Sequence, residues 1–210
     1  AIGAHPDDVE FHMAGALLLL KRAGYDIHYF CLASGSCGTV QYSPAKIRRM
    51  RAAEAREGAR ILGAHFHPSI TDDLEIVYSV DLLRKVAGVV RQVHPVIVLT
   101  HSPQDYMEDH MATSRLAVTA AFTRGMPNFR TMPRPQPGDH DVTVNHTMPQ
   151  GFCDQLRQPV IPGAFINTTA VHSIKREALS AHKSQQNWLD VSQKFNSYIQ
   201  SMENASLAMG

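Results

Sequence analysis

Apolar residues recur along the chain in two alternating patterns, one typical of helices and the other of buried strands. A stripe through Met13, Leu17 and Leu20 predicts a helix over 9–23, closed by Gly24 at its C-cap. The run Pro-Val-Ile-Val-Leu-Thr over 95–100 predicts a buried strand. Similar patterns predict helices over 46–62, 80–93 and 110–123 and a mostly helical 172–202, with strands over 1–4, 27–32, 65–70, 142–147 and 164–167.

This order of elements indicates the fold class. Strands that alternate with helices of this length are typical of βαβ units, so we expect an α/β, Rossmann-like fold with a mostly parallel sheet flanked by helices. The sequence has no internal repeat, and we expect residues 1–210 to form a single domain. The first strand is expected to lack its leading residues. The segment 124–141, with prolines at 127, 133, 135 and 137, is expected to be a loop.

Composition narrows the possible partners. With 44% hydrophobic and 19% charged residues, the chain has the composition of a folded protein, and its net charge of +1 provides no global field for nucleic acid. The longest apolar run, 14–20, is too short for a membrane span. Three cysteines favour a reducing compartment, so we expect a cytoplasmic protein, although the missing N-terminal residues leave secretion open. Twelve histidines favour a metal site.

Two polar clusters follow predicted strands at their carboxyl ends, where open α/β sheets bind ligands. The first is His5-Pro6-Asp7-Asp8, and the second is the segment 101–110. Imidazole and carboxylate together suit zinc with one open coordination position. On local sequence alone, an alternative is equally open, in which Asp7 or Asp8 caps the next helix and His5 bonds the backbone.

Four motifs in order resemble the LmbE-like deacetylases, also called the PIG-L family. They are the heptapeptide Ala4-His5-Pro6-Asp7-Asp8-Val9-Glu10, Arg51-Ala52-Ala53-Glu54, the segment 105–110, and Ala181-His182-Lys183-Ser184-Gln185. The resemblance covers most of the chain. It implies the LmbE-like fold and a zinc-dependent enzyme that removes N-acetyl groups from GlcNAc-containing substrates.

The resemblance also implies roles for individual residues. His5, Asp8 and His110 would bind one Zn²⁺ per chain, and Asp7 would be the general base that activates a zinc-bound water. Arg51 would bind substrate, with the alternative that it belongs to a solvated charged helix face. We further expect Tyr106 and Asp105 to contact substrate. Glu10 and Asp109 are predicted to orient metal-bound imidazoles, or otherwise to be exposed acids at helix starts.

One position departs from the family pattern. Many relatives have His-Pro-Asp-His where this chain has Met107-Glu108-Asp109-His110, and a methionine side chain cannot donate a proton. The acid that protonates the leaving amine could be Asp7 itself, or His182, Tyr106 or His146. We expect Asp7 to act with help from His182.

The predicted function is removal of an N-acetyl group from a small GlcNAc-type sugar or glycoconjugate by a homo-oligomeric zinc hydrolase. Three alternatives stay open: a metal-binding protein with lost or altered catalysis, a hydrolase of another amide, and an esterase. A nucleotide-binding module is disfavoured, because carboxylates replace the glycine-rich loop after the first strand. His65 and His67 point to one face of a strand, which can hold a metal, although an edge or interface role is favoured.

Overall fold

The computed structural model describes residues 1–193 and 198–209, and the chain divides into two units. Unit 1 combines Ala1–Ala4 with Leu74–Val160, and unit 2 combines His5–Asp73 with Ile161–Gly210. Each unit contains parallel strands and helices, and the named strand pairs within the described residues are all parallel. These observations confirm the predicted α/β class with parallel strand pairing.

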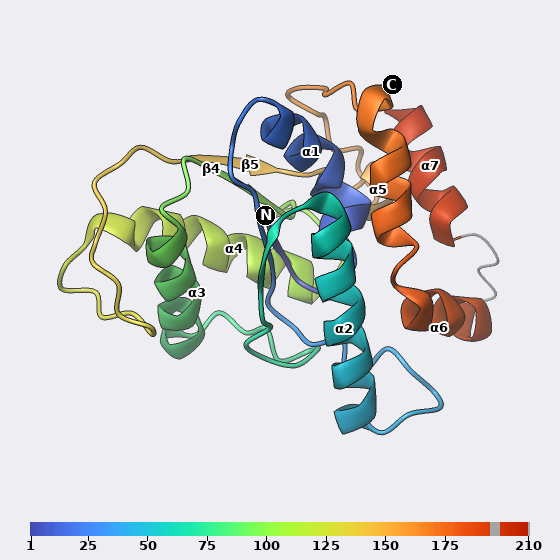
Figure 1. The fold of residues 1–210 in the computed structure, drawn as a ribbon, viewed down its shortest axis with the longest axis horizontal. Helices are drawn as coiled ribbons and strands as arrows, with labels where there is room; N and C mark the ends of the chain where they lie inside the picture. The colour runs from blue at the N-terminus through green and yellow to red at the C-terminus, as the bar shows by residue number, and fades with distance from the viewer. Residues whose placement is uncertain (194–197, 210) are drawn as a thin grey trace. The chain divides into compact units, whose positions relative to one another are not determined.

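Unit 1 is built around the apolar strand β4 (Ile97–Thr100). This strand pairs with β1 (Ile2–Gly3) on one side and with β5 (Thr143–His146) on the other. Two helices, α3 (Val80–Val93) and α4 (Glu108–Phe122), lie side by side and α4 contacts β4 (Figure 1). Ser79 caps α3, because its hydroxyl accepts a hydrogen bond from the Leu82 amide at 3.2 Å. The pairing of β4 with both neighbouring strands therefore fixes the start of the segment 101–107, which connects β4 to α4.

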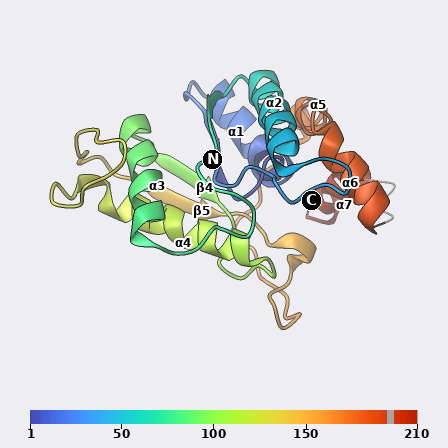
Figure 2. The ribbon, with the colours of Figure 1, turned by 90° about the horizontal axis from the view of Figure 1, so that it is seen from below.

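Unit 2 pairs β2 (His28–Cys31) with β3 (His65–His67). The long helix α2 (Pro44–Leu62) starts with proline in its first turn and ends at Gly63, whose φ of 66° is left-handed. Figure 2 shows α2 beside α5 (His172–Leu179), and α2 also contacts α6 (Lys183–Gln193), which contacts α7 (Tyr198–Ala208). The helix α1 (Ala14–Arg22) continues directly from η1 (Val9–Met13), which is π-helical.

Several predicted boundaries differ from those observed. The predicted helix 9–23 is divided between η1 and α1, and the helix predicted over 110–123 is α4, which starts at Glu108 and is followed by the 3-10 turn η2 (Thr123–Gly125). The strand predicted over 65–70 ends at His67, because Pro68 has no N–H to donate to a ladder. The segment 172–202, predicted to be mostly helical, contains α5, α6 and the first part of α7, and its residues 194–197 lie outside the described part of the chain.

One predicted strand is wrong. Residues 164–167 form no strand, and the apolar side chains of Phe165 and Ile166 are exposed. A short apolar run alone does not make a strand, because the backbone also needs a partner in a ladder. The segment predicted as a loop over 124–141 has no helix or strand over 126–141, and its first two residues belong to η2. That residues 1–210 form a single domain stays a prediction.

None of the helices in the described residues combines the length with the apolar character that a membrane crossing needs.

Candidate active site

The segment His5-Pro6-Asp7-Asp8 forms a tight turn that runs straight into the π-helical η1. Asp7 has a φ of 103°, which is a strained conformation for a residue with a Cβ. A π-helical turn is also rare and tends to occur at functional sites. The fold therefore holds unfavourable backbone geometry at the position where the sequence predicts catalysis.

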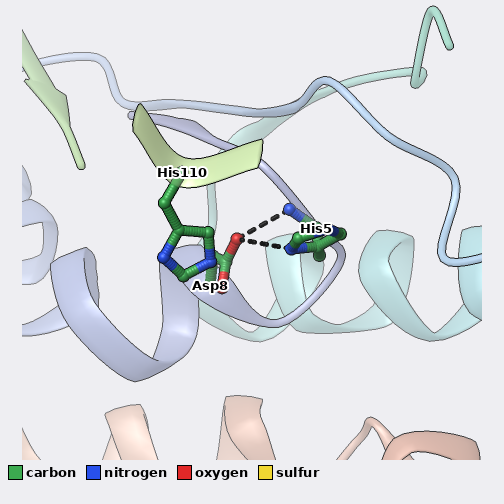
Figure 3. A group of neighbouring side chains, drawn as sticks. All are labelled: His5, Asp8 and His110. Atoms are coloured by element: carbon green, nitrogen blue, oxygen red, sulfur yellow. Dashed lines mark hydrogen bonds and ion pairs between the residues drawn. The ribbon is translucent and has the colours of Figure 1, made fainter. Parts of the chain in front are cut away.

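Two of the predicted metal ligands, His5 and Asp8, meet in this turn. The Asp8 carboxylate accepts a hydrogen bond from the His5 backbone N–H at 2.6 Å and lies 3.5 Å from His5 Nδ1 (Figure 3). Asp8 is buried, and the side chain of His5 keeps 15% of its surface exposed. An imidazole nitrogen and a carboxylate oxygen at this separation suit two ligands of one divalent ion.

Asp7, the predicted base, is held by two partners on opposite oxygens. Arg51 Nη2 lies 3.2 Å from Oδ1, and the hydroxyl of Tyr198 donates to Oδ2. Burial raises the pKa of Asp7 above its ordinary value, and Arg51 opposes that rise. The carboxylate is therefore fixed in orientation and made more basic than an exposed aspartate, as a general base requires.

Arg51 is 2% exposed, so it is not part of a solvated helix face. Besides Asp7, its guanidinium donates to the carbonyl of Pro6 and to the side chain of Gln185. Gly35 packs on it so closely that a Cβ there would lie 2.4 Å from Arg51 Cδ. The guanidinium thus connects the turn before η1, the loop after β2 and helix α6. Its predicted contact with substrate stays a prediction.

A second buried pair, Glu10 with His182, lies in the same unit. His182 Nε2 is 2.8 Å from Glu10 Oε1, and both side chains are 0% exposed. Burial lowers the pKa of His182, but the adjacent Glu10 carboxylate outweighs it and raises the pKa above its ordinary value. Tyr29 donates to the other Glu10 oxygen at 3.1 Å and accepts from the Asp7 amide at 3.4 Å. Glu10 therefore holds the imidazole of His182 and is not an exposed acid, and its predicted role toward a metal-bound imidazole stays a prediction.

In unit 1, His110 is held at the start of α4 by Asp105. His110 Nδ1 is 3.0 Å from Asp105 Oδ2, and both residues are buried. Burial raises the pKa of Asp105, but His110 outweighs that effect, so the pKa lies below its ordinary value. An ionised carboxylate only accepts, so Nδ1 carries the proton and Nε2 is the nitrogen with the lone pair. That tautomer is the one a metal-binding histidine needs.

His101 completes this local cluster. Its ring stacks on His110 with centroids 3.9 Å apart, and its Nε2 accepts from the Ala4 amide at 2.9 Å. Ligand atoms of His101, Asp105 and His110 all lie within 4.8 Å of one another, which is close enough for one ion. In this structure Asp105 bonds directly to His110, and the Ala4 amide fixes the His101 ring that stacks on His110. These contacts hold His110 in place.

The remaining predicted residues of unit 1 have different surroundings. The buried Asp109 accepts from the Leu74 amide at 2.9 Å, and Tyr106 is 59% exposed. His146 Nδ1 lies 2.7 Å from the carbonyl oxygen of His101 and 3.2 Å from Ser114 Oγ. Asp109 is therefore not an exposed acid at the helix start, and its predicted role toward a metal-bound imidazole stays a prediction. The predicted roles of Tyr106 and His146 in substrate binding and proton transfer also stay predictions.

Sequence reasoning missed Tyr198, Tyr29 and Gln185. Tyr198 is 191 positions from Asp7 and belongs to no recognisable motif. Tyr29 resembles any apolar strand residue, and only its side-chain hydroxyl between Asp7 and Glu10 reveals a role. Gln185 was within the fourth family motif, so its position next to Arg51 could have been suspected from the sequence.

The sequence of this chain is similar to that of known proteins. Residues 1–121 match the family model described as PIG-L: GlcNAc-PI de-N-acetylase. Over 191 residues the chain is 28% identical to diacetylchitobiose deacetylase of Thermococcus kodakarensis, covering 88% of this chain and 68% of that protein. It is also 28% identical over 197 residues to 4-oxalmesaconate hydratase of Pseudomonas putida, covering 88% and 72%.

A solved structure extends this similarity to the whole fold. The structure of N,N'-diacetylchitobiose deacetylase from Pyrococcus horikoshii, complexed with its inhibitor MPG, matches with a TM-score of 0.83 at 22% identity. The match covers 100% of this chain and 76% of the other. The fold of the relative is therefore the fold of this chain.

Proposed function

Because the chain belongs to the PIG-L family of GlcNAc-PI de-N-acetylases, we propose that it is a metal-dependent N-deacetylase of an amino-sugar substrate. The two relatives named as diacetylchitobiose deacetylases support the substrate class. The observation that carries the proposal is Asp7, a buried carboxylate held on both oxygens directly beside Asp8.

We propose His5, Asp8 and His110 as the protein ligands of a divalent ion, with Zn²⁺ as the first candidate. The donor set fits such an ion: two imidazoles and one carboxylate are a common set of three zinc ligands with one position left for substrate or water. His110 is already fixed by Asp105 in the tautomer that presents Nε2. When bound, the metal would polarise the acetamide carbonyl and stabilise negative charge on its oxygen.

Proton transfer falls to Asp7 in this proposal. Its carboxylate takes a proton from the attacking water and returns that proton to the nitrogen of the leaving amine. Arg51 and Tyr198 keep the carboxylate in one rotamer through both transfers. We assign Arg51 to this positioning role, because its Nη1 donates to Gln185 and its Nη2 to Pro6 and Asp7.

His182 acts through Glu10 and not on the substrate. Its Nε2 pairs with Glu10, and the ring is 0% exposed. The pair fixes Glu10 of η1, and the Glu10 carboxylate raises the pKa of His182. With Met107 at the family's histidine position, and with His5 and Asp8 assigned to the metal, Asp7 is the titratable side chain of the His5–Asp8 turn that is left to accept and return a proton.

A second candidate function is hydration. The relative from Pseudomonas putida, named a hydratase, is as similar to this chain as the named deacetylase. Adding water to a double bond also needs a base and a polarising metal, so the same residues suit both reactions. Substrate assays separate them.

The test uses purified protein that is stripped with chelator and reloaded with Zn²⁺. We expect free amine and acetate to form from N,N'-diacetylchitobiose, and no hydration of 4-oxalmesaconate. Asp7→Asn should keep the metal and lose most turnover, whereas His110→Ala should lose the metal. If the protein binds stoichiometric metal but releases no amine from a panel of N-acetyl sugars, the proposed deacetylase activity is rejected. Full turnover in Asp7→Asn would show that Asp7 is not the general base.

A further inference from the structure

Three histidines gather on one face of the β2–β3 ladder, outside the candidate active site. The parallel register places His28 opposite His65 and Phe30 opposite His67. Residues two apart on a strand share a face, so the three imidazoles project from the same side. His28 Nδ1 lies 3.0 Å from His67 Nε2, and the His28 and His65 ring centroids are 4.8 Å apart.

This cluster is separated from Asp7 by the sheet itself. Tyr29, the next residue after His28, projects from the opposite face, and its hydroxyl contacts Asp7 and Glu10. A ligand on the histidine face would therefore not touch the proposed base.

The surroundings favour the neutral form of two of these imidazoles, those of His28 and His67. Burial and then the neighbouring His67 and His65 lower the pKa of His28 to about 4. Burial also lowers the pKa of His67. Neutral imidazole is the form that binds metal ions, so ligand formation requires no loss of charge from these side chains.

We propose that His28 and His67, joined by His65, form a second divalent-metal site for a borderline ion such as Zn²⁺, Ni²⁺ or Cu²⁺. Imidazole ligands suit these ions. Two nitrogens at about 2.0–2.1 Å from a tetrahedral zinc are about 3.3 Å apart, close to the observed 3.0 Å between His28 and His67.

Binding needs a movement of side chains, because suitable nitrogen atoms of the three histidines do not all lie within 4.8 Å of one another in the structure. One of the two facing nitrogens now carries the shared proton, and a tautomer shift moves that proton to the other nitrogen of the same ring, leaving two lone pairs toward the ion. His65 is exposed, so its ring can turn to become the third ligand. Water completes the coordination. The bound ion would connect β2 to β3.

The experiment counts metal per chain by Zn²⁺ titration calorimetry and equilibrium dialysis of the full protein. We expect two equivalents for the wild type. His67→Gln and His28→Gln should each keep the equivalent at the proposed active site and the deacetylase activity. Asp8→Ala should keep the equivalent at the histidine cluster. His172→Gln, which changes a histidine away from the cluster, should retain both.

A spectroscopic measurement keeps the test independent of folding losses and of the proposed activity. Cu²⁺ bound to Asp8→Ala should show nitrogen hyperfine splitting in its electron paramagnetic resonance spectrum. His65→Gln, an exposed change that removes the proposed third ligand, should weaken the second equivalent at least about tenfold, since even the loss of a residue that orients a ligand typically costs that much. One equivalent in the wild type would overturn the second site, as would a second equivalent that survives in both His28→Gln and His67→Gln.

Discussion

The buried pair between Arg51 and Asp7 allows a prediction whose magnitude follows from the structure. The side chains are 3% and 6% exposed, and Nη2 lies 3.2 Å from Oδ1. At that separation two unit charges attract by about 5 kcal/mol for an effective dielectric constant of about 20. Desolvation offsets much of this attraction while the pair is intact, so the pair itself adds little net stability.

Removing only the arginine changes that balance. Arg51→Met leaves a buried carboxylate without its cation, which typically costs about 3–5 kcal/mol. For a chain of this size, each kcal/mol shifts the Tm by about 2–4 °C, so we expect a loss of about 6–20 °C. The double variant Arg51→Met with Asp7→Asn removes both charges and should be less destabilised than Arg51→Met alone.

Urea denaturation of the four proteins in the double-mutant cycle measures this effect. The measurements should be made in EDTA, because a bound metal would add its own stabilisation. Arg49→Met on the exposed face of the same helix is the matched control and should change the free energy of unfolding by less than about 0.5 kcal/mol. If the effects of Arg51→Met and Asp7→Asn add within about 0.5 kcal/mol, the pair is not coupled and the reasoning fails.

Three further predictions rest on other contacts. Gly58→Ala should destabilise the protein by about 1–3 kcal/mol in urea melts, because its Cβ would lie 2.0 Å from Glu10 Oε1; a gain in stability, as helix propensity alone predicts, would contradict the close packing. Asp105→Asn should lower metal affinity about 10–100-fold in chelator competition, while the exposed Asp139→Asn should not, and equal affinities would remove Asp105 as the residue that orients His110. The folded pKa of His28, about 4, is below the ordinary 6.5, so the unfolded chain binds more protons between these values, and the contribution of His28 is complete above about pH 6.5 and is lost as pH falls toward 4. Thermal melts from pH 4 to 7 should therefore show a flatter acid limb for His28→Asn, and parallel curves would refute the assignment.

The sequence predicted those parts of the molecule that local patterns determine. The helix at 80–93 was located correctly because apolar periodicity and the Ser79 cap agree with each other. The roles of Asp7, Asp8 and His5 came from a resemblance and not from physics, since capping explained the same residues equally well. The resemblance is confirmed by the family match over residues 1–121.

Other features depend on contacts that no local pattern encodes. Arg51 shares its helix with many charged residues, and only the fold determines that it alone is buried against Asp7. The strand predicted over 164–167 is wrong because its backbone has no partner, which a pattern of side chains cannot reveal. Tyr198 could not be found because a tyrosine in a helix is usually a packing residue.

The pairing of Glu10 with His182 joins positions that are 172 residues apart in the chain. During synthesis the N-terminal turn therefore emerges long before its supports, and a nascent chain that ends after residue 121 already carries His5, Asp8 and His110 while lacking His182, Gln185 and Tyr198. Such a fragment holds the three proposed metal ligands and leaves the proposed base beside them without its supports. If the proposal holds, assembly of the base is a late event that is tied to completion of the C-terminal helices, and proteolytic removal of those helices is expected to reduce turnover more than metal binding.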